Sequence, residues 1–206
     1  MIVIPEKKFI FLRVPRTAST SLSHFLLENM KDVVSIKHTP VYYSNYRGPN
    51  PIFNPDLIHA NVGELVEAGI IDPDTVVDSR IFAVVRDPID RFISYAYHIN
   101  LGNTERDINK LVEKTIMTNL PQKQSNWLLV DNKQISDICC FNKLSEMTHS
   151  IFKYLGIKSS GNIYYSHRSE ERENKSCVID KNLEKAILDL YHEDQTLYVE
   201  ALNKNG

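Results

Sequence analysis

The sequence predicts an α/β protein with a central, mostly parallel β-sheet and helices on both faces. Wholly apolar runs such as Ile81–Val85 are typical of parallel strands that are covered on both sides. Segments with apolar residues at helical spacing alternate with these runs along the chain. Such alternation implies βαβ units. At this length we expect one domain over residues 1–206.

The first half of the chain contains two strand–helix units. Its expected elements are, in order, a strand over Phe9–Val14, a helix over Ser19–Lys31, a candidate strand over Val33–Ile36, a surface loop over 38–56, a helix over Val62–Ala68 and a strand over Ile81–Val85. The loop is rich in Tyr, Asn, Pro and Gly, and loops of this length are usually functional or disordered. Gly69 ends the short helix.

The second half begins with a helix that Asp87 caps and Pro88 opens. Its expected core side consists of Ile89, Phe92, Ile93 and Ala96. The later elements are a helix over 105–117, a strand over Ile135–Phe141, a helix over Lys143–Leu155 that ends at Gly156, a polar irregular segment over 158–180 and one long helix over Asn182–Leu202. The apolar stripe of that last helix comprises Leu183, Ile187, Leu190, Leu197, Tyr198 and Ala201.

Composition excludes several classes of protein. A net charge of −2 argues against a general nucleic-acid-binding surface, so any anion site has to be built locally. Cys139, Cys140 and Cys177 have neither disulfide-framework nor zinc spacing, and we interpret them as reduced thiols of a cytoplasmic protein. No apolar run approaches the roughly 20 residues that span a bilayer, and the N-terminus lacks a secretion signal. We therefore predict no metal, nucleic-acid or membrane partner.

Two strand-to-helix turns carry unusual polar residues, at strand ends where α/β proteins bind ligands. The first is Pro15-Arg16-Thr17-Ala18-Ser19-Thr20-Ser21, whose helix-start N–H groups, hydroxyls and arginine are typical of an anion site. A plain helix-capping cluster explains the same residues. The turn lacks the G-x-x-x-x-G-K-[ST] pattern of ATP- and GTP-binding loops.

The second turn lies in VVRDPIDRFISYAYH. Arg86 stands at the strand end, and Arg91 and Ser94 are one helical turn apart, opposite the apolar face. We predict that these three residues face a crevice. A solvated helix face, with Asp87 or Asp90 bridging to an arginine, is the alternative.

Together the turns resemble the paired cofactor motifs of sulfotransferases that use 3′-phosphoadenosine 5′-phosphosulfate (PAPS). VPRTASTSL resembles the 5′-phosphosulfate loop, P-K-T-[GA]-[GS]-T-[ST], and VVRDPIDRFISYAY resembles the 3′-phosphate motif, R-D-P-x-x-R-x-x-S. Their order and their spacing of about 70 residues agree with the family. The resemblance implies a three-layer, P-loop-like sulfotransferase fold.

Other segments extend the resemblance over nearly the whole chain, least in 38–56 and 158–180. IHANVGELV (58–66) is similar to the H-A-D-W-T-E-L stretch of heparan sulfate 6-O-sulfotransferases, whose histidine is the general base. RVPRTASTS is closest to uronyl 2-O-sulfotransferases. QKQSNWLL, DICCFNKLSEM and LYHEDQTLY resemble segments of small carbohydrate sulfotransferases.

The resemblance assigns roles to individual residues. It implies His59 as general base, with His38 and His98 as the reserve candidates, and Arg16 as a catalytic and cofactor-binding cation. The other implied cofactor-binding residues are Arg13, Thr17, Ala18, Ser19, Thr20, Ser21, Arg86 and Ser94. One departure is that Arg16 stands where the family has lysine, and these two cations are not equivalent.

The sequence thus predicts transfer of a sulfuryl group from PAPS to an acceptor hydroxyl by in-line displacement, with 3′-phosphoadenosine 5′-phosphate (PAP) as product. We expect a glycan acceptor, with other hydroxyl-bearing acceptors as alternatives, and a bacterial or viral origin. A P-loop-like small-molecule kinase and a catalytically weak nucleotide-binding protein of the same fold are the competing hypotheses. Acceptor identity and oligomeric state stay open.

Overall fold

The computed structural model describes residues 1–4, 7–30, 59–67, 69, 71–100, 105, 107–130, 133–135, 137–157 and 179–204. Within these residues the largest sheet has four strands in the order β1-β2-β3-β6. The strands are β1 (Ile2–Ile4), β2 (Phe9–Phe11), β3 (Arg80–Val85) and β6 (Asp137–Cys140). The β2–β3 and β3–β6 pairs are parallel, whereas β1 is antiparallel to β2. The prediction of a mostly parallel sheet is confirmed.

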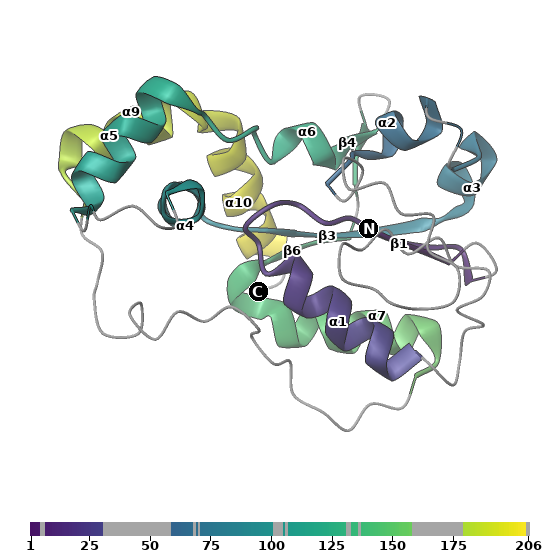
Figure 1. Ribbon diagram of the computed structural model, residues 1–206. Coiled ribbons are helices and arrows are strands. Elements are labelled where there is room, and N and C mark those ends of the chain that lie inside the picture. Colours follow the sequence, from purple (N-terminus) through teal and green to yellow (C-terminus); the bar gives the residue numbers. More distant parts are fainter. Residues whose placement is uncertain are drawn as a thin grey trace.

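Helices cover both faces of the sheet, as predicted (Figure 1). On one face lie α1 (Ser19–Met30) and α7 (Leu144–Leu155). On the other lie α2 (Val62–Glu67), α3 (Pro73–Asp78), α6 (Ser125–Leu128) and α10 (His192–Lys204). Successive side chains of a strand point to opposite faces. Accordingly, Phe82 and Val84 of β3 join the core beneath α1 and α7, while Ala83 and Val85 join the core beneath α2, α6 and α10.

A third apolar cluster joins α4 (Pro88–Ile99), α5 (Ile108–Thr118) and α9 (Lys181–Leu190) at one end of the sheet. Phe92, Ile93 and Ala96 of α4 are buried in it, and Ile89 packs against it, so the predicted core side is confirmed. The Asp87 carboxylate accepts hydrogen bonds from the N–H groups of Ile89 and Asp90, as expected of the cap.

The prediction of one long C-terminal helix is wrong. The chain turns at Tyr191, between α9 and α10, and the Tyr191 hydroxyl donates a hydrogen bond to the carbonyl oxygen of Pro121 at 2.6 Å. Because the helix is interrupted there, the apolar stripe is not continuous. Ile187, Tyr198 and Ala201 are buried, but Leu190 is 38% exposed.

Other differences concern short elements without a strong sequence signal. Strand β1, helices α3 and α6, and the hairpin of β4 (Leu129–Val130) and β5 (Lys133–Gln134) were not predicted. Helix α7 follows a 3₁₀ turn over Phe141–Lys143 and ends at Gly156, which has the left-handed conformation (φ 71°) typical of this position. The candidate strand Val33–Ile36, the 38–56 loop and residues 158–178 lie outside the described residues.

Candidate functional site

The two polar turns lie next to each other at the edge of the sheet where parallel strands end. Strands β2 and β3 are neighbours, with Phe11 opposite Phe82. The N–H of Leu12 extends this pairing by donating to the carbonyl oxygen of Phe82 at 2.8 Å. The β2–α1 turn and the β3–α4 turn therefore begin side by side, in the position where α/β proteins hold ligands.

The β2–α1 turn forms without glycine because two other residues adopt left-handed conformations. Arg16 has φ 66° and Ala18 has φ 60°. Each such conformation costs a residue with a Cβ about 1–2 kcal/mol. Strain of this kind persists only where the surrounding structure holds it, and it clusters at functional sites. Turns that contain left-handed residues also aim consecutive N–H groups into a concavity that suits an anion.

The hydroxyl groups of the turn brace its backbone. Thr17 and Ser19 are buried, and both donate to the carbonyl oxygen of Val14 at 2.9 Å. The Thr20 hydroxyl accepts a hydrogen bond from Arg13 at 2.7 Å. We expected these hydroxyls to face a bound anion, but in this structure they are used within the turn. Ser21, one residue later, is also buried.

Arg13 lies beneath the turn rather than at its surface. Its side chain is only 4% exposed, and this burial lowers the pKa of Arg13 to about 10, which keeps the guanidinium protonated at neutral pH. Arg13 therefore adds positive charge to the site from below.

Arg16 connects the two turns directly. Its Nε and Nη2 atoms donate to the hydroxyl oxygen of Ser94 at 3.1 and 3.0 Å. Ser94 lies on α4 and is 2% exposed. The forked guanidinium makes both contacts, whereas an ammonium group would present a single point charge. The structure thus brings together two predicted site residues that are 78 positions apart in the chain.

Arg86 stands at the end of β3, as predicted, with a side chain that is 16% exposed. Its guanidinium lies over the ring of Phe141, 4.5 Å from the ring centroid, and 4.0 Å from the Asp90 carboxylate. Packing on an aromatic ring holds the flat guanidinium in place.

The prediction that Arg86, Arg91 and Ser94 face an open crevice is wrong for Ser94 and Arg91. Ser94 is 2% exposed and lies against the Arg16 guanidinium. Arg91 is enclosed by main chain. It is 2% exposed and donates to the carbonyl oxygens of Pro15 (3.0 Å) and Gln122 (2.9 Å). The helical spacing did place Arg91 beside Ser94, but the chain around Pro15 and Gln122 covers this part of α4.

His59 lies beside the first turn and is held in one orientation. Its Nδ1 is 2.9 Å from the carbonyl oxygen of Arg13, and its own carbonyl oxygen accepts from Nε1 of Trp127. A carbonyl oxygen can only accept, so Nδ1 of the neutral ring carries the proton. The Nε2 atom is then unprotonated and able to receive a proton.

The surroundings of His59 favour its neutral form. The residue keeps a solvent-exposed surface, but the ring lies against the turn, and this loss of water contact lowers the pKa of His59 to about 4. The positive charges of Arg13 and Arg16 act in the same direction, whereas the hydrogen bond to the Arg13 carbonyl opposes them. At neutral pH the ring is an uncharged base next to two cations.

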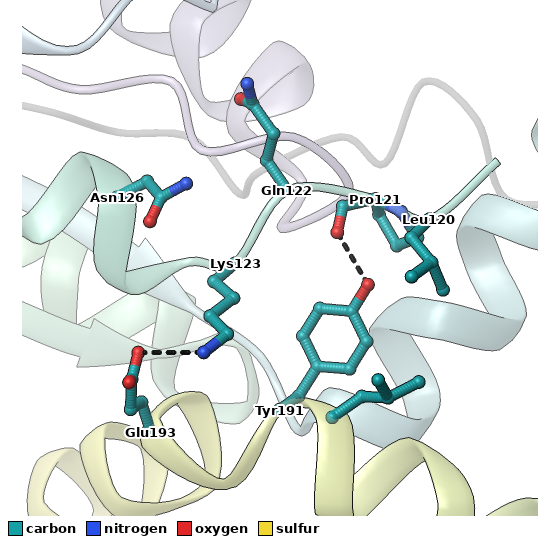
Figure 2. A pocket seen from close by; sticks show the side chains of 8 residues that line it. Leu120, Pro121, Gln122, Lys123, Asn126, Tyr191 and Glu193 are labelled. Carbon is teal, nitrogen blue, oxygen red and sulfur yellow. Dashed lines mark hydrogen bonds and ion pairs between the residues drawn. The ribbon is translucent and has the colours of Figure 1, made fainter. Parts of the chain in front are cut away.

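A surface cavity of about 450 Å³ lies between residues 120–126 and the junction of α9 and α10 (Figure 2). It is lined by Leu120, Pro121, Gln122, Lys123, Asn126, Leu190, Tyr191 and Glu193. Lys123 and Glu193 form an ion pair of 3.2 Å at its side. None of the predicted site residues lines this cavity.

Among the residues that the structure describes, no group of three or more His, Cys, Asp and Glu side chains is placed to hold a metal ion. No helix there has the length and apolar character needed to cross a membrane.

Comparison with known families decides the class of protein. The model of the family described as "Sulfotransferase family" matches residues 1–154, well over half of the chain and including both turns and His59. The chain belongs to the sulfotransferase family. The match ends before α9 and α10. Neither the curated proteins nor the solved structures gave a match.

Sequence reasoning did not find several residues that shape this candidate site. They are Trp127, which holds His59, and Gln124 and Asp194, which are completely buried. Each acts through contacts with residues far away in the chain, so no local pattern marks its role. The only signals near them were the resemblances of QKQSNWLL, which contains Gln124 and Trp127, and of LYHEDQTLY, which contains Asp194, to family segments.

Proposed function

We propose that this sulfotransferase moves the sulfuryl group of PAPS to an acceptor hydroxyl. The contact between Arg16 and Ser94 carries the proposal, because it makes the two motifs that resemble phosphate-binding signatures into one site. The mostly parallel sheet with helices on both faces is consistent with the P-loop-like fold that the resemblance implies.

The donor set fits a nucleotide with anionic groups at two positions. In this assignment Arg16 and the backbone N–H groups of residues 17–21 hold the 5′-phosphosulfate at the start of α1. Arg86 and Ser94 hold the 3′-phosphate near the start of α4. The positive charges that lower the pKa of His59 support an anion site here, because they come from Arg13 and Arg16.

The chemistry assigned to the chain is proton transfer and charge stabilisation. PAPS supplies the sulfuryl group, and its bridging S–O bond breaks as the bond between acceptor oxygen and sulfur forms. Nε2 of His59 takes the hydroxyl proton of the acceptor. Arg16 offsets negative charge that develops on the leaving phosphate oxygen, a task that preorganised cations perform well in a site shielded from water. Where the family has lysine, the planar guanidinium of Arg16 performs this task with several N–H donors, whereas an ammonium group acts as a point charge.

We propose a carbohydrate hydroxyl as the acceptor. This proposal is supported by the similarity of residues 58–66 to the histidine segment of heparan sulfate 6-O-sulfotransferases and of residues 13–21 to uronyl 2-O-sulfotransferases. Labelled sulfate transfer, screened over glycans, lipids, phenols and peptides, tests it. Transfer to phenols or peptides with none to glycans would contradict it.

Isothermal titration calorimetry with PAP and ATP separates this function from the two alternatives. We expect PAP to bind and ATP to bind weakly, because ATP lacks the 3′-phosphate. Tight ATP binding without a response to PAP would favour the kinase hypothesis. PAP binding without turnover on any acceptor class would favour a catalytically weak nucleotide-binding protein.

Replacing Arg86 with alanine is expected to weaken PAP binding about 10- to 150-fold. The variant removes a charge-assisted contact to the 3′-phosphate, worth roughly 1.5–3 kcal/mol. Arg80→Ala is the matched control, since Arg80 begins the same strand and pairs with Asp137 at 2.6 Å, away from the strand's carboxyl end. Calorimetry on both variants measures the effect, and equal PAP affinities would exclude Arg86 from the 3′-phosphate site.

The pH dependence of the reaction is expected to follow His59. Only the neutral ring accepts a proton, so activity falls as pH falls through its pKa of about 4 in the free enzyme. The pH profile of kcat/KM for PAPS should therefore stay level from neutral pH down to about pH 5. Bound anions favour the protonated ring, so the acid limb of kcat should lie at higher pH. A kcat/KM limb centred near the ordinary histidine value of about 6.5 would contradict the assignment.

A further inference from the structure

Residues 121–125, which we call the bridging segment, are fastened to the start of α10. The Asp194 carboxylate is completely buried and accepts hydrogen bonds from the N–H groups of Gln124 (2.7 Å) and Ser125 (3.0 Å). The Tyr191 hydroxyl holds the carbonyl oxygen of Pro121. Figure 2 shows this bond and the outer ion pair of Lys123 with Glu193.

The bridging segment in turn holds the main chain at the end of β3. The Gln124 side chain is buried, and its Oε1 accepts from the N–H of Arg86 at 2.9 Å. Its Nε2 donates to the carbonyl oxygen of Arg86 at 2.8 Å. Because each peptide unit is planar, these two bonds fix the peptide planes on both sides of Arg86.

Arg91 connects the same segment to the first turn. It donates to Gln122 of the bridging segment and to the carbonyl oxygen of Pro15, and its Nη1 lies 3.7 Å from the Asp194 carboxylate. In a trans peptide the N–H points opposite to the carbonyl group. Holding the Pro15 carbonyl therefore sets the direction of the Arg16 N–H, at one of the two residues of the turn that adopt the left-handed conformation.

We propose that Asp194 is a positioning residue of the nucleotide site, which acts through the bridging segment and Arg91 to fix the main chain at Pro15 and Arg86. The inference rests on the proposed function for what the two turns bind. It goes beyond the proposed function because it assigns a role at the nucleotide site to α10, which lies after residue 154, where the family match ends. Well-packed apolar residues often stabilise a fold as well as a buried ion pair does, so stability alone does not explain this pair. Here its hydrogen bonds lead to both turns.

The variant Asp194→Asn tests the inference, because asparagine keeps the shape but removes the charge and one acceptor. We expect faster amide hydrogen exchange, followed by mass spectrometry, in peptides that cover residues 14–18 and 85–88. Peptides from α7 should exchange as in the wild type. Asp189→Asn is the matched control, since Asp189 is an exposed partner of Lys185 on α9. Unchanged exchange at both turns, or an equal increase over the whole chain, would overturn the inference.

Nucleotide affinity provides the second readout. Asp194→Asn is expected to raise the Kd for PAP about tenfold, as the loss of one well-placed polar contact would. If the wild type binds PAP and Asp194→Asn binds it with the same Kd, the positioning role of Asp194 is overturned, but the proposed function is not. If the wild type does not bind PAP, the proposed function fails, whereas the exchange data still decide whether Asp194 orders the turns.

Gln124→Met covers the case in which Asp194→Asn does not fold. This variant removes the side-chain bonds to Arg86 but leaves the backbone N–H that Asp194 accepts. Exchange should then increase at residues 85–88 and stay unchanged at 14–18, because Arg91 still holds Pro15. If exchange changed by the same amount in both peptides, or in neither, the proposed connection from Gln124 to the main chain at Arg86 would be overturned.

Discussion

Replacing His59 with alanine is expected to lower kcat by about 10²- to 10⁴-fold while leaving the Kd for PAP nearly unchanged. The variant removes the proposed proton acceptor, but it leaves Arg16, Arg86 and Ser94 in place. Radiolabelled or coupled sulfate-transfer assays give kcat, and calorimetry gives the Kd. The separation of the two constants is the decisive feature, since a residue that served only to bind the nucleotide would change both.

His149→Ala is the matched control for that experiment. His149 lies exposed on α7, so its removal should change neither constant. A His59→Ala enzyme with more than a tenth of the wild-type kcat would contradict the role of His59 as base. In that case His98, on α4, becomes the next candidate among the described residues.

The part of the site that follows from local chemistry could be predicted from the sequence. The strand Ile81–Val85, the Asp87 cap and the polar turn after Phe9–Val14 each depend on residues within one or two helical turns. Two consecutive parallel strands with polar turns at their carboxyl ends then predict a shared edge. The absence of glycine in the first turn has a structural explanation, because Arg16 and Ala18 take the left-handed conformations themselves.

The parts that depend on distant contacts could not be predicted. Helical spacing put Arg91 on the polar side of α4, yet the carbonyl oxygens of Pro15 and Gln122, from two other segments, enclose it. The spacing of apolar residues also does not predict the turn at Tyr191, because the Tyr191 hydroxyl binds Pro121, which is distant in the sequence. Asp194 lies in a helix that reads as amphipathic, and only the fold shows that its carboxylate is buried.

Replacing Arg91 with methionine is expected to lower the free energy of unfolding strongly. It leaves the carbonyl oxygens of Pro15 and Gln122 without this donor and the buried Asp194 carboxylate without this cation. Removing one partner of a buried ion pair typically costs 3–5 kcal/mol. Small proteins have a total unfolding free energy of about 5–15 kcal/mol, so this is a large share. Urea unfolding measures it as a lower midpoint at an unchanged slope.

Two further variants are compared with Arg91→Met: one is a control at an exposed ion pair, and the other keeps the charge of Arg91 but changes its shape. Lys185→Met breaks the exposed pair with Asp189 and should change the unfolding free energy by less than about 1 kcal/mol. Arg91→Lys keeps the charge but not the fork, and should lie between Arg91→Met and the wild type. A loss below about 1 kcal/mol for Arg91→Met would show that the pair and its two carbonyl contacts contribute little.

The double variant Arg91→Met/Asp194→Asn shows whether the two side chains act as one unit. Once Asp194 is an uncharged amide, removal of Arg91 no longer strands a buried charge. The double variant should therefore be more stable than the sum of the two single losses predicts, by roughly 1–3 kcal/mol. Additive losses would mean that Arg91 stabilises the fold through Pro15 and Gln122 alone, and that the 3.7 Å contact with Asp194 does not couple α10 to the first turn.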